Sequence, residues 1–166
     1  ARADSSTQVG TDTPRPTVRL PIIPGYDIER LLGRGGMGIV FQARHRALGR
    51  TVAIKMLLPQ EFIDARTLRR FQTEAEAVAK LQHPNIVQIF EVGETDGHPW
   101  FALEYVAGGS LDKFFQNQPQ TPTESAALIL SLARAMQACH DRGIIHRDLK
   151  PANVLLAAGP TSGQRE

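Results

Sequence analysis

The feature that most constrains the fold is a glycine-rich run at residues 33–40, which follows the pattern G-x-G-x-x-G-x-V. A dinucleotide-binding fold needs a helix after such a run, and an acidic residue about 20 positions further on to hold the ribose. Here strand-forming residues 39–41 follow, no acidic residue occurs between Glu29 and Glu61, and the Gly-Lys-Ser/Thr of a P-loop is missing. The run therefore predicts a glycine hairpin between two strands, whose backbone N–H groups can approach phosphates closely. A hairpin without a ligand is the alternative that the run alone leaves open.

The pattern along the chain predicts an α+β fold, with a small antiparallel sheet and one helix followed by a helical region. Val, Ile and Phe mark the strand segments, which are separated by turn residues. Helical spacing of apolar residues predicts one helix over residues 68–81. A short helix is expected after Ser110, and a long one from Thr121 to near Gly143, with a capping box completed by Glu124. The expected strands are residues 26–32, 39–43, 51–57, 86–91 and 100–106.

Composition limits the setting in which the chain works. Lys and Arg number 19 against 17 Asp and Glu, so the net charge of +2 does not favour nucleic acid as a partner. The single cysteine and the absence of a metal-ligand cluster suit a reducing compartment. The sequence shows neither a membrane-length apolar run nor a signal peptide. We therefore expect a cytoplasmic chain, or the cytoplasmic part of a membrane-anchored parent, with no membrane contact of its own. Residues 1–24 hold four prolines without apolar periodicity and predict a flexible leader.

A lysine and a glutamate are predicted to form an ion pair. Lys55 lies on a strand of period two, where it shares one face with Ala53, while Val52 and Ile54 share the other. On the helical wheel of residues 68–81, Glu74 lies inside the apolar stripe. A carboxylate that points into a packed interface costs several kcal/mol unless it is paired. Lys55 is its natural partner, and a solvated Glu74 at the edge of the helix is the alternative.

A third cluster, residues 144–156, places eight polar-loop residues between two apolar runs that we expect to anchor in a core. Within this polar loop, residues 146–153, Asp148 can accept a proton from a hydroxyl nucleophile and Lys150 can neutralise a phosphoryl group. The side-chain oxygen of Asn153 can hold a metal ion. All three roles belong to one reaction, phosphoryl transfer.

Taken together, these motifs resemble a eukaryotic-type protein kinase, and in particular the bacterial serine/threonine kinases. Lys55 and Glu74 lie 19 residues apart, like the strand-to-helix spacing of the family. The resemblance implies a kinase small lobe and hinge over residues 25–106 and the start of the large lobe over residues 107–166. The matching segments are residues 33–40, 52–55, Glu74, 83–87, 104–109 and 146–153.

The resemblance also implies a role for each matching residue. Asp148 is the catalytic base, Lys150 the phosphate clamp and Lys55 the contact to the α and β phosphates of ATP, held in place by Glu74. Asn153 is a ligand of Mg²⁺, and the acceptors are Ser and Thr hydroxyls of proteins. The implied nucleotide-binding residues are Leu32, Gly33, Arg34, Gly35, Gly36, Met37, Gly38, Val40, Ala53, Lys55, Leu103, Glu104, Val106, Asn153 and Leu155.

The chain departs from the family pattern after Asn153, where the family continues with an Asp-Phe-Gly metal site. The only acidic residue in that part of the chain is Glu166. Together with the start at Ala1 rather than Met, this leads us to expect a fragment of a longer kinase that is inactive alone. The alternative is a non-catalytic nucleotide-binding or regulatory half-kinase module.

Overall fold

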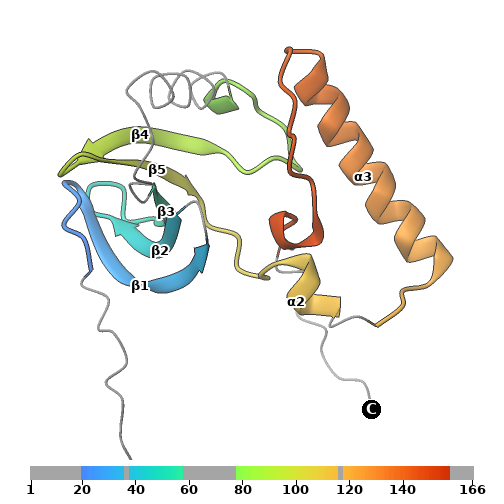
Figure 1. The fold of residues 1–166 in the computed structure, drawn as a ribbon, viewed down its shortest axis with the longest axis horizontal. Coiled ribbons are helices and arrows are strands. Elements are labelled where there is room, and N and C mark those ends of the chain that lie inside the picture. Colours follow the sequence, from blue (N-terminus) through green and yellow to red (C-terminus); the bar gives the residue numbers. More distant parts are fainter. Residues whose placement is uncertain (1–19, 36–37, 58–77, 116–117, 158–166) are drawn as a thin grey trace, which may run out of the picture.

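The computed structural model describes residues 20–35, 38–57, 78–115 and 118–157. In these ranges an antiparallel five-stranded sheet, with strand order β1-β2-β3-β5-β4, is followed by a helical part (Figure 1). This arrangement confirms the α+β prediction. The elements are β1 (Tyr26–Gly35), β2 (Gly38–His45), β3 (Thr51–Leu57), β4 (Ile89–Thr95), β5 (His98–Glu104), α2 (Leu111–Phe115), α3 (Pro122–His140) and the 3₁₀ turn η1 (Pro151–Asn153).

The expected strands all form, but the bounds of the last pair were wrong. β4 begins at Ile89 rather than at residue 86, and β5 covers His98–Glu104 rather than residues 100–106. The Asp96-Gly97 turn sets this register, because both residues have positive φ, 50° and 73°, and they bring Thr95 opposite His98. The residues before β4 are held by a turn instead, in which the Ile86 N–H donates to the carbonyl oxygen of His83 at 3.1 Å.

The main core covers one face of the sheet and draws on β1, β2, β3 and β5. Phe41, Ile54 and Trp100 are buried there together with Tyr26 and Ile23. Ile23 is only 1% exposed, so the packed region reaches back into the segment that the sequence assigned to the leader. The Tyr26 hydroxyl donates to the Glu91 carboxylate at 2.5 Å and thereby joins β1 to β4, which lie at opposite edges of the sheet. The sheet is therefore strongly curled.

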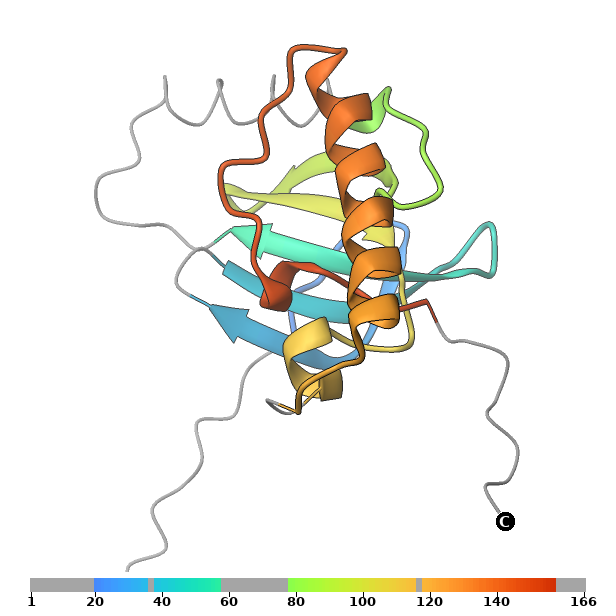
Figure 2. The same ribbon diagram turned by 90° about the vertical axis from the view of Figure 1, so that its right-hand side faces the viewer.

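The long helix α3 begins as the sequence predicts. The Thr121 hydroxyl accepts from the Glu124 N–H at 3.2 Å, and the Glu124 carboxylate accepts from the Thr121 N–H at 3.1 Å, which completes the capping box. The helix ends at His140, close to the expected end near Gly143, and Gly143 makes the turn that follows with φ 71°. In Figure 2, α3 crosses in front of the sheet.

Burial of α3 is one-sided. Ala135 and Cys139 are its buried residues, whereas the side of Ile129, which is 62% exposed, is open. The expected helix over residues 68–81 is described only at its end, where residues 78 and 79 are helical. Glu74, and also Glu76, which the helical wheel of the sequence places outside the apolar stripe, lie outside the described residues. Within the described part of the chain, no helix has both the length and the hydropathy needed to cross a membrane.

Candidate functional site

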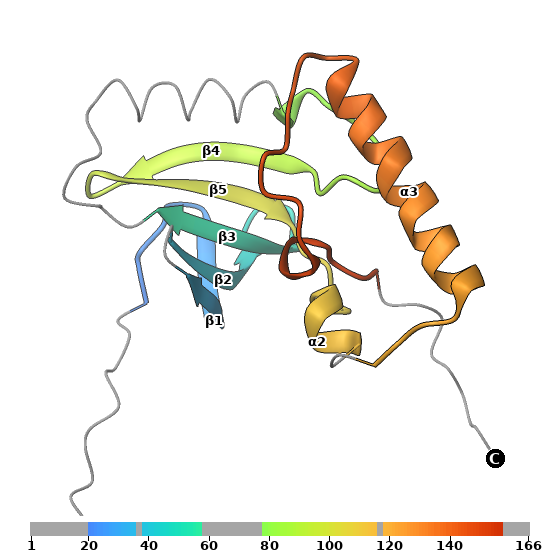
Figure 3. The same ribbon diagram turned by 45° about the vertical axis from the view of Figure 1, so that its right-hand side comes forward.

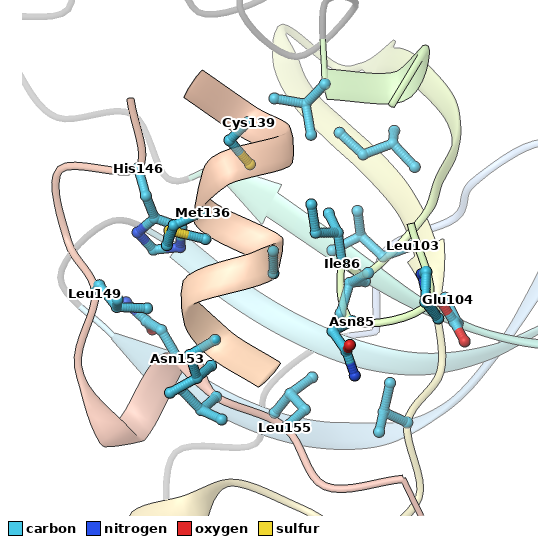
Figure 4. A pocket seen from close by; sticks show the side chains of 18 of the residues that line it. Asn85, Ile86, Leu103, Glu104, Met136, Cys139, His146, Leu149, Asn153 and Leu155 are labelled. Atoms are coloured by element: carbon cyan, nitrogen blue, oxygen red, sulfur yellow. The ribbon is translucent and has the colours of Figure 1, made fainter. Parts of the chain in front are cut away.

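A cavity of about 1100 Å³ lies between the sheet, the 84–87 segment, α3 and the polar loop. Figure 4 shows Met136 and Cys139 on α3, with His146 on one side of the helix and Ile86 and Leu103 on the other. The predicted nucleotide-binding residues among those that line the cavity are Lys55, Leu103, Glu104, Val106, Asn153 and Leu155. The structure thus brings together, around one space, residues that lie up to 100 positions apart in the sequence.

Lys55 reaches this cavity because of the two-residue period of β3. Val52 and Ile54 are fully buried in the core on the opposite face, as the alternation predicted. Lys55 pairs with Val40 on one side and with Phe101 on the other, so it lies in an interior strand of the sheet. Its predicted ion pair with Glu74 stays a prediction, since Glu74 lies outside the described residues.

The glycine hairpin joins β1 and β2, with Gly35 opposite Gly38, as the sequence predicted. A Cβ added at Gly33 or Gly35 would meet nothing within 4 Å, so these two positions have open space beside the backbone. A Cβ added at Gly38 would lie 2.4 Å from the Met56 carbonyl oxygen. Close packing against β3 therefore requires glycine at position 38 without any ligand. Gly36 and Met37 lie outside the described residues.

The segment that leaves β5, residues 104–107, forms the hinge between the sheet and the helical part. The Glu104 N–H donates to the Gln88 carbonyl oxygen at 2.9 Å, which ties the hinge to the start of β4. Among the described residues, no backbone or side-chain acceptor takes the Val106 N–H. The hinge thus offers a backbone donor beside the cavity. The predicted residues Leu32, Arg34, Val40 and Ala53 are described but do not line the cavity, and the same is true of Gly33, Gly35 and Gly38.

The polar loop brings Asp148, Lys150 and Asn153 together, as the sequence predicted. The Lys150 ammonium lies 2.9 Å from Oδ1 of Asp148. Asn153 Nδ2 donates both to the Asp148 carbonyl oxygen, at 2.8 Å, and to Asp148 Oδ2, at 2.9 Å. The hydrogen bonds from Lys150 and Asn153 hold the pKa of the Asp148 carboxyl below its ordinary value. The exposed Asp148 is therefore a carboxylate at neutral pH, and the side-chain oxygen of Asn153 takes no part in these two bonds.

Backbone hydrogen bonds hold the polar loop in this shape. Arg147 takes a positive φ of 61°, and Pro151 begins the short turn η1, in which the Asn153 N–H donates to the Lys150 carbonyl at 2.8 Å. The residues after the loop run beside the first residues after the hinge, where Leu111 N–H donates to the Val154 carbonyl at 2.8 Å. Consequently α2 and η1 lie side by side (Figure 3).

The apolar runs on either side of the polar loop do not anchor in a core, and that prediction was wrong. Ile145 is 65% exposed, and Leu155 is also exposed. The anchoring comes from the backbone ladder to residues 108–111, in which an isolated bridge pairs Ser110 with Leu155. Sequence reasoning also missed Gly108, where an added Cβ would lie 2.2 Å from the Leu156 carbonyl oxygen. The Gly-Gly pair at 108–109 is the signal that could have revealed this close approach.

Comparison with known proteins gives one consistent result. The model of the protein kinase domain family matches residues 26–161. The chain is 38% identical over 144 residues to the serine/threonine-protein kinase PknJ of Mycobacterium tuberculosis, covering 87% of this chain and 24% of PknJ. It is 44% identical over 138 residues to the probable serine/threonine-protein kinase PknB of Lactococcus lactis, covering 82% of this chain and 22% of that protein. The chain thus spans about a quarter of the length of these curated relatives.

A solved structure is also similar. The crystal structure of the Mycobacterium tuberculosis PknI kinase domain matches with a TM-score of 0.73 and 35% sequence identity. The match covers 83% of this chain and 57% of that one. The match is long enough to include both the sheet and the helical part, so the similarity in sequence and the similarity in fold point to the same family.

Proposed function

Because the chain belongs to the protein kinase family, we propose that its cavity binds ATP and that its polar loop directs transfer of the γ-phosphoryl group to protein Ser and Thr hydroxyls. The observation that carries this proposal is the cluster of Asp148, Lys150 and Asn153 at hydrogen-bond distance, of which Asn153 lines the cavity and Asp148 and Lys150 do not. The sheet, with the hinge to residue 106, corresponds to the small lobe, and residues from 107 onward correspond to the start of the large lobe. The place of action that we propose is the cytoplasm.

In the proposed complex the nucleotide lies between the glycine hairpin and the hinge. The Val106 N–H is the proposed donor to the edge of the adenine, and the carbonyl of Glu104, whose N–H is bonded to Gln88, is the proposed acceptor. Leu103 and Leu155 supply apolar surface beside it. The ammonium of Lys55 faces the same cavity and neutralises the α and β phosphates. Gly33 and Gly35 leave the backbone of the hairpin open to phosphate oxygens.

The proposed chemistry depends on Asp148 as an ionised carboxylate. It orients the Ser or Thr hydroxyl and accepts its proton as the oxygen attacks phosphorus. The Lys150 ammonium, 2.9 Å from that carboxylate, neutralises charge on the transferred phosphoryl group. Because its pKa is lowered, the Asp148 carboxyl is in the ionised state that a proton acceptor needs at neutral pH.

The residues present fit part of a magnesium site. With its nitrogen held by Asp148, the side chain of Asn153 presents its oxygen, a ligand type that Mg²⁺ accepts. The chemistry that Mg²⁺ supplies when bound is neutralisation of charge on the ATP phosphates. Among the described residues there is no group of three or more His, Cys, Asp or Glu side chains placed to hold a metal. Asn153 alone does not complete the site, so we expect no transfer by this chain on its own.

The experiment separates nucleotide binding from transfer. Binding of ADP and ATP to the purified chain is measured by calorimetry for the wild type, Lys55→Met and the control Lys80→Met, a surface lysine away from the cavity lining. We expect Lys55→Met to weaken binding and Lys80→Met to leave it unchanged. Equal affinities in all three proteins would contradict the proposed site.

Transfer is measured with radiolabelled ATP and a Ser/Thr substrate protein, both for this chain and for the chain joined to the remainder of a kinase domain. In the joined protein, Asp148→Asn should lower turnover by about 10²-fold or more, while Asp141→Asn at the end of α3 should not. Glu74→Gln should lower turnover where Glu76→Gln does not, because only Glu74 lies in the apolar stripe of the expected helix. Nucleotide binding without any transfer in the joined protein would instead favour the regulatory half-kinase module.

A further inference from the structure

A side-chain hydrogen bond links the first strand of the sheet to the hinge. Nη2 of Arg30 on β1 donates to the hydroxyl of Tyr105 at 3.3 Å, across 75 positions of sequence. Tyr105 lies between Glu104 and Val106 and lines the cavity. Arg30 precedes Gly33, the first glycine of the hairpin, by three residues. The bond therefore connects the base of the glycine hairpin to the hinge.

The guanidinium of Arg30 is itself held in place on the sheet. Its Nε donates to Oε1 of Gln42 on β2 at 3.0 Å, and Nε2 of Gln42 donates to Glu29 at 2.7 Å. Both polar atoms of the Gln42 amide are thus engaged, which orients the oxygen toward Arg30. The hydrogen-bonded series runs from Glu29 through Gln42 and Arg30 to Tyr105.

A register shift in β1 makes this series possible. In a regular strand, consecutive residues point to opposite faces, so Glu29 and Arg30 could not both reach one side chain. The pairing of β1 with β2 shifts between Ile28 and Arg30, where Glu29 has no partner in the ladder. This bulge turns both side chains toward Gln42.

From this geometry we propose that Arg30 is a positioning residue of the nucleotide site, which holds the hinge at a set distance from the glycine hairpin. The inference rests on the proposed function, because it assumes that a nucleotide contacts both elements. A ligand that contacts both the hinge and the hairpin binds more tightly when the two are already held at the right distance, because less ordering is needed on binding. A ligand that binds the hinge alone does not.

The same reasoning separates a positioning role from a purely structural one. The residues of the series are at the surface, except for the half-buried Gln42 and Tyr105, and a single exposed hydrogen bond contributes little to unfolding free energy. A structural role would therefore change stability and all ligand affinities together. A positioning role changes the affinity for ADP and leaves the affinity for adenosine, which carries no phosphate, unchanged.

The test is calorimetric titration of the full chain with ADP and, separately, adenosine. The proteins are the wild type, Arg30→Met, Tyr105→Phe, the double variant and the control Arg44→Met, an exposed arginine on the neighbouring strand β2. We expect Arg30→Met and Tyr105→Phe each to weaken ADP binding about 2- to 10-fold, the range of one net hydrogen bond, without changing adenosine binding. The double variant should bind ADP no more weakly than the weaker-binding single variant, because both substitutions remove the same hydrogen bond.

Three results would overturn the inference: equal losses for ADP and adenosine, losses that multiply in the double variant, or a loss in Arg44→Met that matches Arg30→Met. If the wild type binds no ADP, the proposed function fails. Amide hydrogen exchange without ligand then tests whether the bond from Arg30 to Tyr105 holds the hinge. Arg30→Met should raise exchange at the Glu104 amide, whose N–H donates to the Gln88 carbonyl oxygen, several-fold relative to Arg44→Met. Unchanged exchange there would show that Arg30 does not hold the hinge.

Discussion

Replacing Gly108 by alanine should release the polar loop from the helical part while leaving the sheet folded. The Gly108 N–H donates to the Leu156 carbonyl oxygen at 3.0 Å, and the Leu156 N–H donates to the Gly109 carbonyl at 2.9 Å. A methyl group at position 108 would lie 2.2 Å from that same Leu156 oxygen. Because the obstacle is backbone rather than a flexible side chain, the two segments must move apart.

The magnitude follows from the hydrogen bonds that this movement breaks. Three backbone bonds join the segments, the third running from the Leu111 N–H to the Val154 carbonyl at 2.8 Å. At a net value of roughly 0.5–1.5 kcal/mol for each bond, their loss costs about 1.5–4.5 kcal/mol locally. The open population should therefore rise at least about tenfold. Since Asn153 immediately precedes Val154, its two bonds to Asp148 weaken as well.

Native-state amide hydrogen exchange measures this opening residue by residue. In Gly108→Ala, the amides of Leu111 and Leu156 should exchange at least about tenfold faster, whereas the core amide of Ile54 should not change. The matched control is Gly33→Ala, where the added Cβ meets nothing within 4 Å and φ is not in the left-handed range. Unchanged exchange at Leu111 and Leu156 would refute the close-approach argument.

Three further predictions concern the sheet and α3. Gly93→Ala places a Cβ 2.3 Å from the ring of Trp100 and should lower the unfolding free energy by about 1–3 kcal/mol. Unfolding in urea is followed by the fluorescence of Trp100, the one tryptophan of the sequence, and an unchanged or higher unfolding free energy contradicts the prediction. Burial and the hydrogen bond to Glu91 raise the pKa of Tyr26, so the neutral phenol stabilises the fold below about pH 10 and this contribution is lost as the pH rises further. Urea midpoints should fall more steeply above pH 10 in the wild type than in Tyr26→Phe, and parallel curves would contradict this. Burial also raises the pKa of the Cys139 thiol, so an aromatic disulfide reagent should react far more slowly with the native chain than with the chain in urea, and equal rates would show the thiol to be accessible.

Local patterns in the sequence were enough to predict the elements and one cluster of the site. The alternation around Lys55 and the capping box at Thr121 depend on residues a few positions apart, and both form. The Asp96-Gly97 dipeptide, a turn signal between the last two expected strands, also makes its turn. Asp148, Lys150 and Asn153 also meet within a single short loop. A short stretch of chain has few ways to arrange itself, so these features need no information from distant segments.

Only the tertiary structure decided the features that join distant segments. The sequence offers no local reason for Tyr26 to meet Glu91 or for Arg30 to reach Tyr105. The Gly-Gly pair at 108–109 signals a close approach of backbone, but only the structure shows that Leu156 is the neighbour. Each of these contacts depends on the curl of the whole sheet or on where the helical part returns to it. The start of β4 was misjudged for a local reason, because the Ile86 N–H donates to the His83 carbonyl oxygen in a turn and the strand begins only at Ile89. A chain's local propensities limit each element, whereas burial and backbone pairing over the whole chain decide which elements meet.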